Sequence, residues 1–237
     1  MSTVSPNGVE IYFERHGDQG DPLVLVHGFT GDITDWRHQI SEFAGTHRVL
    51  ILDNRGHGRS GCPDDPDAYA VIRMAEDVEA VASHVGFERF HLLGHSMGGT
   101  IAQEIALRAP ERLHSLILED TSDYFGDHEP RMPDKPPPLP PERLEEVLAR
   151  IGRMSPDTLR ACWRSLRKWD GTKTTAAGIR TRTLIIAGSD DAPTILEGSK
   201  RLAAAIPGAT LRVLEGAGHS PQEERPEEFN AILREFL

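Results

Sequence analysis

The sequence predicts an α/β fold in which a mostly parallel, doubly wound sheet carries a small helical cap. Short apolar runs, of the kind that a parallel sheet buries on both faces, alternate along the chain with stretches of helical periodicity. Glycine-rich turns follow several of these runs. The alternation stops once, over residues 123–178, where prolines accumulate. This pattern indicates one α/β domain with an insertion, and 237 residues are enough for it.

The first predicted element is a hairpin that ends near Glu14. Its signal is Asn7-Gly8, because both residues accept the positive φ angles of a tight hairpin turn. Buried strands are then predicted at residues 23–26, 49–52, 90–93, 113–118, 183–187 and 210–214. Helices are predicted around residues 36–43 and at 69–85, 100–106, 195–205 and 226–236. In this order strands and helices alternate as a doubly wound sheet requires.

The interruption is predicted to be a helical cap over the strand ends, inserted between core segments 1–122 and 179–237. Its entry should be stiff and extended, because it contains Pro133, Pro136, Pro137, Pro138, Pro140 and Pro141. Two amphipathic helices follow at residues 142–151 and 156–169, with Ser155 as N-cap of the second. The first helix gathers Leu144, Val147, Leu148 and Ile151 on one face, and the second gathers Leu159, Cys162, Trp163, Leu166 and Trp169.

Composition excludes several classes of function. Lys and Arg number 26 against 37 Asp and Glu, and the net charge of −11 repels nucleic acid and anionic membrane surfaces. The start of the chain has no basic and apolar leader, and no apolar stretch is long enough to span a bilayer. Cys62 and Cys162 are expected to be free thiols in a reducing compartment. We therefore expect a soluble, cytoplasmic protein that acts on a small molecule.

The main candidate for chemistry is Ser96, in the G-x-S-x-G pattern of residues 94–98. Gly94 and Gly98 let the preceding strand turn sharply into the following helix, which leaves the serine hydroxyl exposed at the tip of the bend. The backbone N–H of Met97 then points toward an oxyanion formed on a carbonyl that Ser96 attacks. The pattern also occurs in ordinary glycine-rich turns, but a strand before it and a helix after it favour a nucleophile.

Two more glycine-rich loops follow predicted strands. In H-G-F-T-G at residues 27–31, the backbone N–H of Phe29 is the natural second donor to an oxyanion. The loop at residues 53–61 lacks both the ending of a P-loop and the spacing of a dinucleotide site. Its Asp53 and Arg55 are therefore interpreted as hydrogen-bonded scaffolding.

A serine needs a base to take its proton and an acid to orient that base. Asp191 and His219 follow consecutive predicted strands, so a parallel sheet brings both to the edge that carries Ser96. Asp190 and Asp120 are alternatives for the acid. Asp191 is preferred to Asp190 because the later position in the turn should reach across toward His219.

Together these stretches resemble the α/β-hydrolase family, in particular its compact, single-cap esterase and lactonase-like members. The matching stretches are 27–31, D-N-R-G-H-G-R-S at 53–60, G-H-S-M-G-G at 94–99, G-S-D-D at 188–191 and G-H at 218–219. The resemblance spans all but the cap. It implies Phe29 and Met97 as the oxyanion hole and Asp191, third after Gly188, as the acid. Relatives such as haloalkane dehalogenases and epoxide hydrolases carry aspartate in place of Ser96, so this sequence departs from them.

The expected activity is hydrolysis of a carboxylic ester or lactone through an acyl-enzyme on Ser96, Asp191 and His219, with no metal and no organic cofactor. Trp163 and Trp169 either pack the cap onto the core or line a substrate pocket. One alternative is C–C bond cleavage or elimination at the same site, as in relatives that resemble the menaquinone-pathway synthase. Such enzymes bind acidic substrates, so a cationic pocket is expected of them. The other alternative is a ligand-binding protein, because some hormone receptors resemble this family.

Overall fold

The computed structural model describes residues 2–125, 140–169, 171 and 175–237. Within these residues eight strands form one sheet in the order β1-β2-β4-β3-β5-β6-β7-β8. They are β1 (Ser2–Val4), β2 (Ile11–His16), β3 (Pro22–Val26), β4 (Arg48–Leu52), β5 (Phe90–His95), β6 (Leu113–Glu119), β7 (Thr183–Gly188) and β8 (Thr210–Leu214). The pairs that join β1, β2 and β4 are antiparallel, and all others are parallel. The predicted mostly parallel sheet is confirmed.

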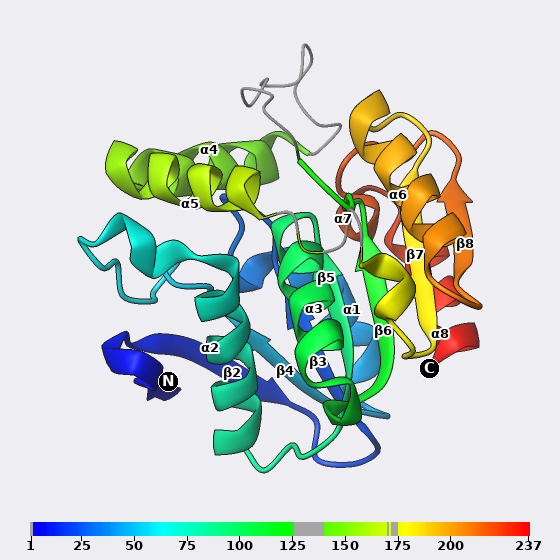
Figure 1. Cartoon of the computed structure of the whole chain (residues 1–237), viewed down its shortest axis with the longest axis horizontal. Coiled ribbons are helices and arrows are strands. Elements are labelled where there is room, and N and C mark those ends of the chain that lie inside the picture. Colours follow the sequence, from blue (N-terminus) through cyan, green and yellow to red (C-terminus); the bar gives the residue numbers. More distant parts are fainter. Residues whose placement is uncertain (1, 126–139, 170, 172–174) are drawn as a thin grey trace.

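The opening hairpin is confirmed as well. Ser2 pairs with Phe13 across it, and Val4 pairs with Ile11. Asn7 and Gly8 have φ angles of 53° and 77°. These are the positive φ angles from which the turn was predicted. The hairpin adds an antiparallel edge to the parallel sheet, next to β4 (Figure 1).

Helices cover both faces of the sheet (Figure 1). On one face lie α2 (Val71–His84), α3 (Met97–Arg108) and α6 (Pro193–Ala205); on the other lie α1 (Arg37–Phe43) and α8 (Pro226–Phe236). All five match predicted helices. The four-residue helix α7 (Pro221–Glu224) was not predicted, because one turn is too short to show periodicity.

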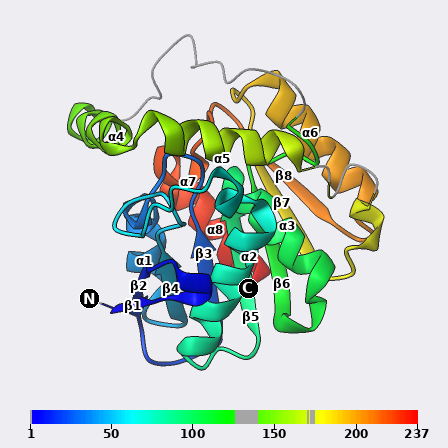
Figure 2. The same ribbon diagram turned by 60° about the vertical axis from the view of Figure 1, so that its left-hand side comes forward.

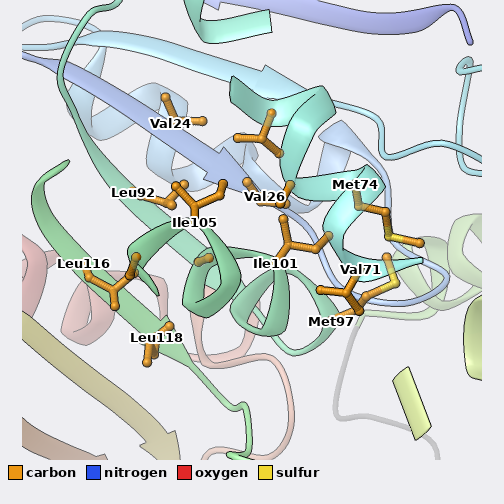
Figure 3. Close-up of a cluster of buried hydrophobic side chains, with 14 of the residues drawn as sticks. Val24, Val26, Val71, Met74, Leu92, Met97, Ile101, Ile105, Leu116 and Leu118 are labelled. Atoms are coloured by element: carbon orange, nitrogen blue, oxygen red, sulfur yellow. The ribbon is translucent and has the colours of Figure 1, made fainter. Parts of the chain in front are cut away.

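The larger part of the core lies between the sheet and helices α2 and α3 (Figure 3). Alternate residues of three adjacent strands point to this side; they are Val24 and Val26 of β3, Leu92 of β5, and Leu116 and Leu118 of β6. They meet Ile101 and Ile105 of α3, while Val71 and Met74 of α2 pack nearby, against Met97. Burying these side chains holds β5 and α3, the two elements joined at Ser96, in a fixed relation.

Helices α4 (Pro141–Arg153) and α5 (Pro156–Lys168) come between β6 and β7 in the chain and lie across the carboxyl ends of the strands (Figure 2). Ser155 is the predicted N-cap of α5, since its hydroxyl accepts the backbone N–H of Thr158 at 3.0 Å. Most of the proline run falls within residues 126–139, outside the described residues. The boundaries 123 and 178 of the cap remain a prediction.

Helix α4 does not bury the face that its apolar residues suggest. Leu148 is 54% exposed, whereas Arg143 and Arg150 are only 3% and 7% exposed. The two arginines are seven residues apart, about two helical turns, and therefore share a face. That face meets carboxylates on the core, because Arg143 bonds Asp35 at 2.7 Å and Arg150 bonds the same carboxylate at 2.8 Å.

Two more carboxylates complete this cluster. Glu223 of α7 accepts from Arg143 at 2.5 Å, and Asp32 accepts from Arg150 at 2.9 Å. Buried charges persist when they are paired, so the arginine face is the one that faces inward. We call Asp32, Asp35, Arg143, Arg150 and Glu223 the α4 ion cluster.

Among the described residues, no helix combines the length and the apolar character that a membrane crossing requires. Cys62 and Cys162 are free thiols, the first exposed and the second buried.

The α4 ion cluster leads to a prediction about stability. Arg143→Met keeps most of the side chain's length but removes its charge, which leaves the buried Asp35 and Glu223 without one donor. We expect a loss of about 3 kcal/mol or more in the free energy of unfolding, measured by urea titration. Arg153 is an exposed arginine of the same helix, so Arg153→Met should change the free energy of unfolding by less than about 0.5 kcal/mol. Equal effects of the two substitutions would contradict the role of the cluster.

Candidate active site

Three of the predicted side chains meet at the carboxyl edge of the sheet. Ser96 follows β5, Asp191 follows β7 and His219 follows β8. His219 Nε2 lies 3.1 Å from Ser96 Oγ, and His219 Nδ1 lies 2.8 Å from Asp191 Oδ2. A carboxylate only accepts, so Nδ1 carries the proton and Nε2 is left to accept one from the serine hydroxyl.

The three candidate acids make different contacts. Asp190 accepts from the hydroxyl of Ser189 at 2.9 Å, and Asp120 accepts the backbone N–H of Gly188 at 2.9 Å. Only Asp191 bonds the imidazole of His219. The preference for Asp191 over Asp190 and Asp120 therefore agrees with the geometry.

Ser96 sits in a strained backbone conformation, with φ at 52°. Its neighbours hold it there through three hydrogen bonds. Its N–H donates to the carbonyl of Glu119 at 2.8 Å, and its carbonyl accepts the Thr121 hydroxyl at 2.8 Å and the Thr100 N–H at 3.1 Å. Such strain persists only where the surroundings fix the conformation, and it is concentrated at functional sites.

The turn closes so tightly that glycine is required on both sides of Ser96. A Cβ atom on Gly94 would lie 2.1 Å from the carbonyl oxygen of Gly98, and one on Gly98 would lie 2.0 Å from that of Val26. Both neighbours are backbone atoms, which cannot move aside as a flexible side chain would. The close approach of α3 to β3 and β5 thus depends on these two residues.

The loop after β3 brings a second backbone donor to the serine. A Cβ atom on Gly28 would lie 3.1 Å from the Cβ of Ser96, so the loop passes directly against the nucleophile. His27 holds the loop: its Nδ1 bonds the Gly28 carbonyl at 2.8 Å, and its Nε2 accepts the Asn54 N–H at 2.9 Å. Among the described residues, the backbone N–H groups of Phe29 and Met97 donate to no other group.

The electrostatics of the site favour charge on His219. Burial disfavours the imidazolium, but the charge of Asp191 and the hydrogen bond to it outweigh this effect and raise the pKa of His219. The imidazole is 43% exposed, so water screens part of the attraction. Burial alone would raise the pKa of Asp191. The charge of His219 and the hydrogen bond to it have the opposite effect and outweigh burial, so the pKa of Asp191 is lowered.

Asp120 is fully buried close to this pair. Burial, followed by the charge of Asp191, raises its pKa well above the ordinary value, so its surroundings favour the neutral form of the carboxyl. Its Oδ1 accepts the Gly188 N–H, and its Oδ2 has no hydrogen-bond partner among the described residues. The neighbouring Glu119 is also buried, and burial raises its pKa well above the ordinary range.

His95, which precedes the serine, supports His219 from below. Its Nε2 lies 2.7 Å from the backbone carbonyl of His219, and the two rings are 5.1 Å apart. Burial lowers the pKa of His95 to about 4, so the ring is neutral and Nε2 carries the proton donated to that carbonyl. Sequence reasoning missed this residue, because the contact joins positions 124 residues apart.

The two candidate pocket tryptophans differ in place. Trp163 is half-buried, and its ring centre lies 6.0 Å from that of Phe29. It lines a cleft of about 1220 Å³ between the cap helices and residues 56–69. Trp169 is buried with the core instead, and its indole N–H donates to Glu104 of α3 at 3.0 Å. Of the two roles considered for Trp169, this position agrees with packing the cap onto the core, since the ring lies where α5 meets the sheet-covering helices.

The loop at residues 53–61 is scaffolding, as interpreted. Asp53 accepts the backbone N–H groups of Ile33 and Arg59 at 2.8 and 2.9 Å, and burial raises its pKa to about 6. Arg55 forms two 2.6 Å bonds with Asp77 of α2, both side chains being buried. No group of three or more metal-ligating side chains within the described part of the chain is arranged to hold a metal ion.

The tight turn at Ser96 leads to a second prediction. Gly98→Ala places a methyl group where the carbonyl of Val26 already lies, so the free energy of unfolding should fall by more than about 3 kcal/mol. Gly152→Ala is the control, because a Cβ atom there meets nothing within 4 Å in helix α4. It should raise stability by up to about 1 kcal/mol through helix propensity. Urea titration measures both, and a neutral Gly98→Ala would contradict the packing described.

Known proteins share both the sequence pattern and the fold. Residues 23–232 match the model of the Alpha/beta hydrolase family. A protein of Azorhizobium caulinodans assigned as the carbamate hydrolase RutD is 32% identical over 96% of this chain and 94% of its own.

Two solved structures extend the comparison. Est816, described as an N-acyl homoserine lactone degrading enzyme, superposes with a TM-score of 0.89 at 30% identity over 100% of both chains. A thermophilic esterase from Thermogutta terrifontis gives 0.84 at 28% identity, over 99% of this chain and 95% of its own. On the family match, the sheet topology and these relatives, the chain is a member of the alpha/beta hydrolase family.

Proposed function

We propose that this protein is a serine hydrolase that cleaves carboxylic esters or lactones through an acyl-enzyme. The observation that carries the proposal is the continuous path from Asp191 to His219 to Ser96, at 2.8 and 3.1 Å. It lies beside two backbone amides that have no partner in the described part of the chain. A hydroxyl, a base and an orienting acid in this arrangement are what acyl transfer requires.

In the first half of the reaction, Ser96 Oγ attacks the substrate carbonyl while His219 Nε2 takes the hydroxyl proton. Asp191 holds the ring in the tautomer that leaves Nε2 free and stabilises the imidazolium that forms. The negative oxygen of the tetrahedral intermediate is bound by the amides of Phe29 and Met97. His219 then gives its proton to the departing alcohol oxygen, and Ser96 is left acylated.

In the second half, a water molecule replaces the alcohol. His219 takes a proton from the water as it attacks the acyl carbonyl, and the same two amides hold the second oxyanion. The proton returns to Ser96 Oγ as the acid product leaves. The neutral His95 keeps the backbone of His219 in place through both halves.

The names of similar proteins support a substrate with an acyl carbonyl next to a leaving group. A lactone-degrading enzyme and an esterase lie among the similar structures, and a carbamate hydrolase among the similar sequences. Esters, lactones and carbamates all offer a carbonyl next to a leaving heteroatom, so Ser96 can attack each in the same way.

A second candidate is cleavage of a C–C bond or elimination on an acidic substrate by the same three residues. A cationic pocket is expected for that reaction, and the cleft at Trp163 is lined by several arginines, among them Arg153 and Arg164. A substrate panel separates the two: p-nitrophenyl esters, a butyrolactone and an aryl carbamate on one side, a diketone and a cyclohexadiene acid on the other. Turnover confined to the second set would replace the ester proposal.

The third prediction concerns the nucleophile. Ser96→Ala should lower kcat for p-nitrophenyl butyrate by about 10⁴-fold or more, because no acyl-enzyme can form. Ser41→Ala, which removes an exposed hydroxyl from α1, should leave kcat unchanged. Unfolding curves for both variants control for misfolding. Undiminished turnover by folded Ser96→Ala would end the proposal.

The fourth prediction is a pH profile. His219 acts as a base only when unprotonated, so kcat/KM rises with pH through its pKa. Because Asp191 raises that pKa, the rising limb should lie above the ordinary histidine value of about 6.5. Asp191→Asn removes the attraction, so the limb should move to lower pH while kcat falls by about 10³-fold or more. A limb that stays in place in this variant would contradict the pairing.

A further inference from the structure

The cleft beside Trp163 carries a charge opposite to that of the chain. The protein has a net charge of −11, yet six cationic side chains line this cleft: Arg150, Arg153, Arg160, Arg164, Arg167 and Lys168. Among the described residues, only two acidic ones line it, Asp64 and Asp157, and Asp157 is already paired with Arg160 at 2.5 Å. The cleft is therefore a concentrated positive region on an acidic protein.

Three of these cations have no acidic partner in the described part of the chain. Arg153, Arg164 and Lys168 are exposed and form no ion pair there. Arg160, Arg164 and Lys168 also follow one another at intervals of four residues on α5, which places like charges side by side at a cost to the helix. An anionic ligand in the cleft would offset that cost.

The inner wall of the cleft adds hydrogen-bond donors without acceptors. Arg150 is 7% exposed, and its Nε bonds no group among the described residues, although Nη1 is engaged by Asp32 and Asp35. The buried indole N–H of Trp163 also has no partner there. Unpaired buried donors are rare in proteins, and both belong to residues that line the same cleft. Two donors and three unpaired cations are complementary to an acceptor-rich anion.

Trp163, which lines the cleft, also lies near a residue of the candidate active site. The ring of Trp163 lies 6.0 Å from that of Phe29, whose amide is a proposed oxyanion donor. A volume of about 1220 Å³ is enough for the remote part of a substrate whose carbonyl lies at Ser96. We propose that the cleft binds an anionic group of the substrate, a carboxylate or a phosphate, that lies away from the bond that is cleaved. This proposal rests on the proposed function.

One experiment measures substrate preference. The substrates are p-nitrophenyl monoesters of straight-chain dicarboxylic acids of graded length, each compared with the same ester whose free carboxylate is converted to an amide. The wild-type kcat/KM should favour the charged ester, through KM, at the chain lengths that reach the cleft. In the double variant Arg153→Glu, Arg164→Glu the preference should fall by about tenfold or more, since attraction becomes repulsion. Arg153→Lys, Arg164→Lys should retain most of it.

A matched control tests whether general surface charge is responsible. The double variant Arg180→Glu, Arg212→Glu makes the same charge change at two exposed arginines outside the cleft, and should leave the preference unchanged. An equal loss in this variant, or no preference in the wild type at any chain length, would overturn the proposal.

A binding experiment separates this proposal from the proposed function. Ser96→Ala protein is titrated calorimetrically with suberic acid monoamide, hexyl phosphate and neutral suberamide. The charged probes should bind at least tenfold more tightly than suberamide, and the stronger of the two identifies carboxylate or phosphate as the ligand class. The cleft variants should abolish the difference. Preferential binding of the charged probes without ester turnover by the wild type would support the anion site and contradict the ester hydrolase proposal. Ester turnover without preferential binding would support the ester hydrolase and contradict the anion site.

Discussion

The left-handed backbone of Ser96 is the constraint on which the rest of the site depends. This conformation turns the chain sharply from β5 into α3 at a single residue. The Ser96 hydroxyl therefore lies at the end of β5, on the same side as the first backbone amides of α3. The conformation is unfavourable in isolation, but the carbonyl of Glu119, the hydroxyl of Thr121 and the N–H of Thr100 hold it. Two of these partners belong to β6 or the turn after it, which ties the elbow to the next strand. Glycine at 94 and 98 lets the backbones come close enough for this to happen.

A second constraint is the separation of carboxyl groups into charged and neutral ones. Asp191 and Asp120 are neighbours, but their pKa values move in opposite directions, since Asp191 bonds the imidazole of His219 and Asp120 is fully buried. The surroundings of Asp191 thus favour the ion that orients His219, and those of Asp120 favour the neutral acid. Ionisation of both would place two negative charges under one histidine. Burial of Asp120 prevents this without any need for a further cation.

Much of the fold and of the site could be predicted from the sequence, for reasons that are local or topological. The strands that became β3 to β8 are short apolar runs, and Ser96 lies in a motif whose flanking elements could be recognised. Asp191 and His219 could be placed because parallel strands end at a common edge, which turns two separate loops into neighbours.

What could not be predicted rests on pairwise contacts between distant residues. Periodicity identified the apolar stripe of α4 but could not show that Arg143 and Arg150 find carboxylates on η2 (Ile33–Trp36), in the residue before it and on α7. The same holds for His95, whose partner is a backbone carbonyl, and for Trp169, whose indole meets Glu104. Burial of a charged side chain depends on its partner, and a single sequence does not state which residues become partners.

The α4 ion cluster has a consequence for protein engineering. A cap that docks through an apolar surface can often be exchanged between related enzymes, because apolar contacts adapt to new neighbours. Here α5 packs on the core through apolar side chains, but the docking of α4 is ionic. It requires five charged residues from three separate stretches of the chain to come together. Replacing this cap with one from another enzyme, or moving this cap onto another core, would leave unpaired charges buried in the interface. To avoid this, the arginines and their carboxylate partners would have to be transferred together.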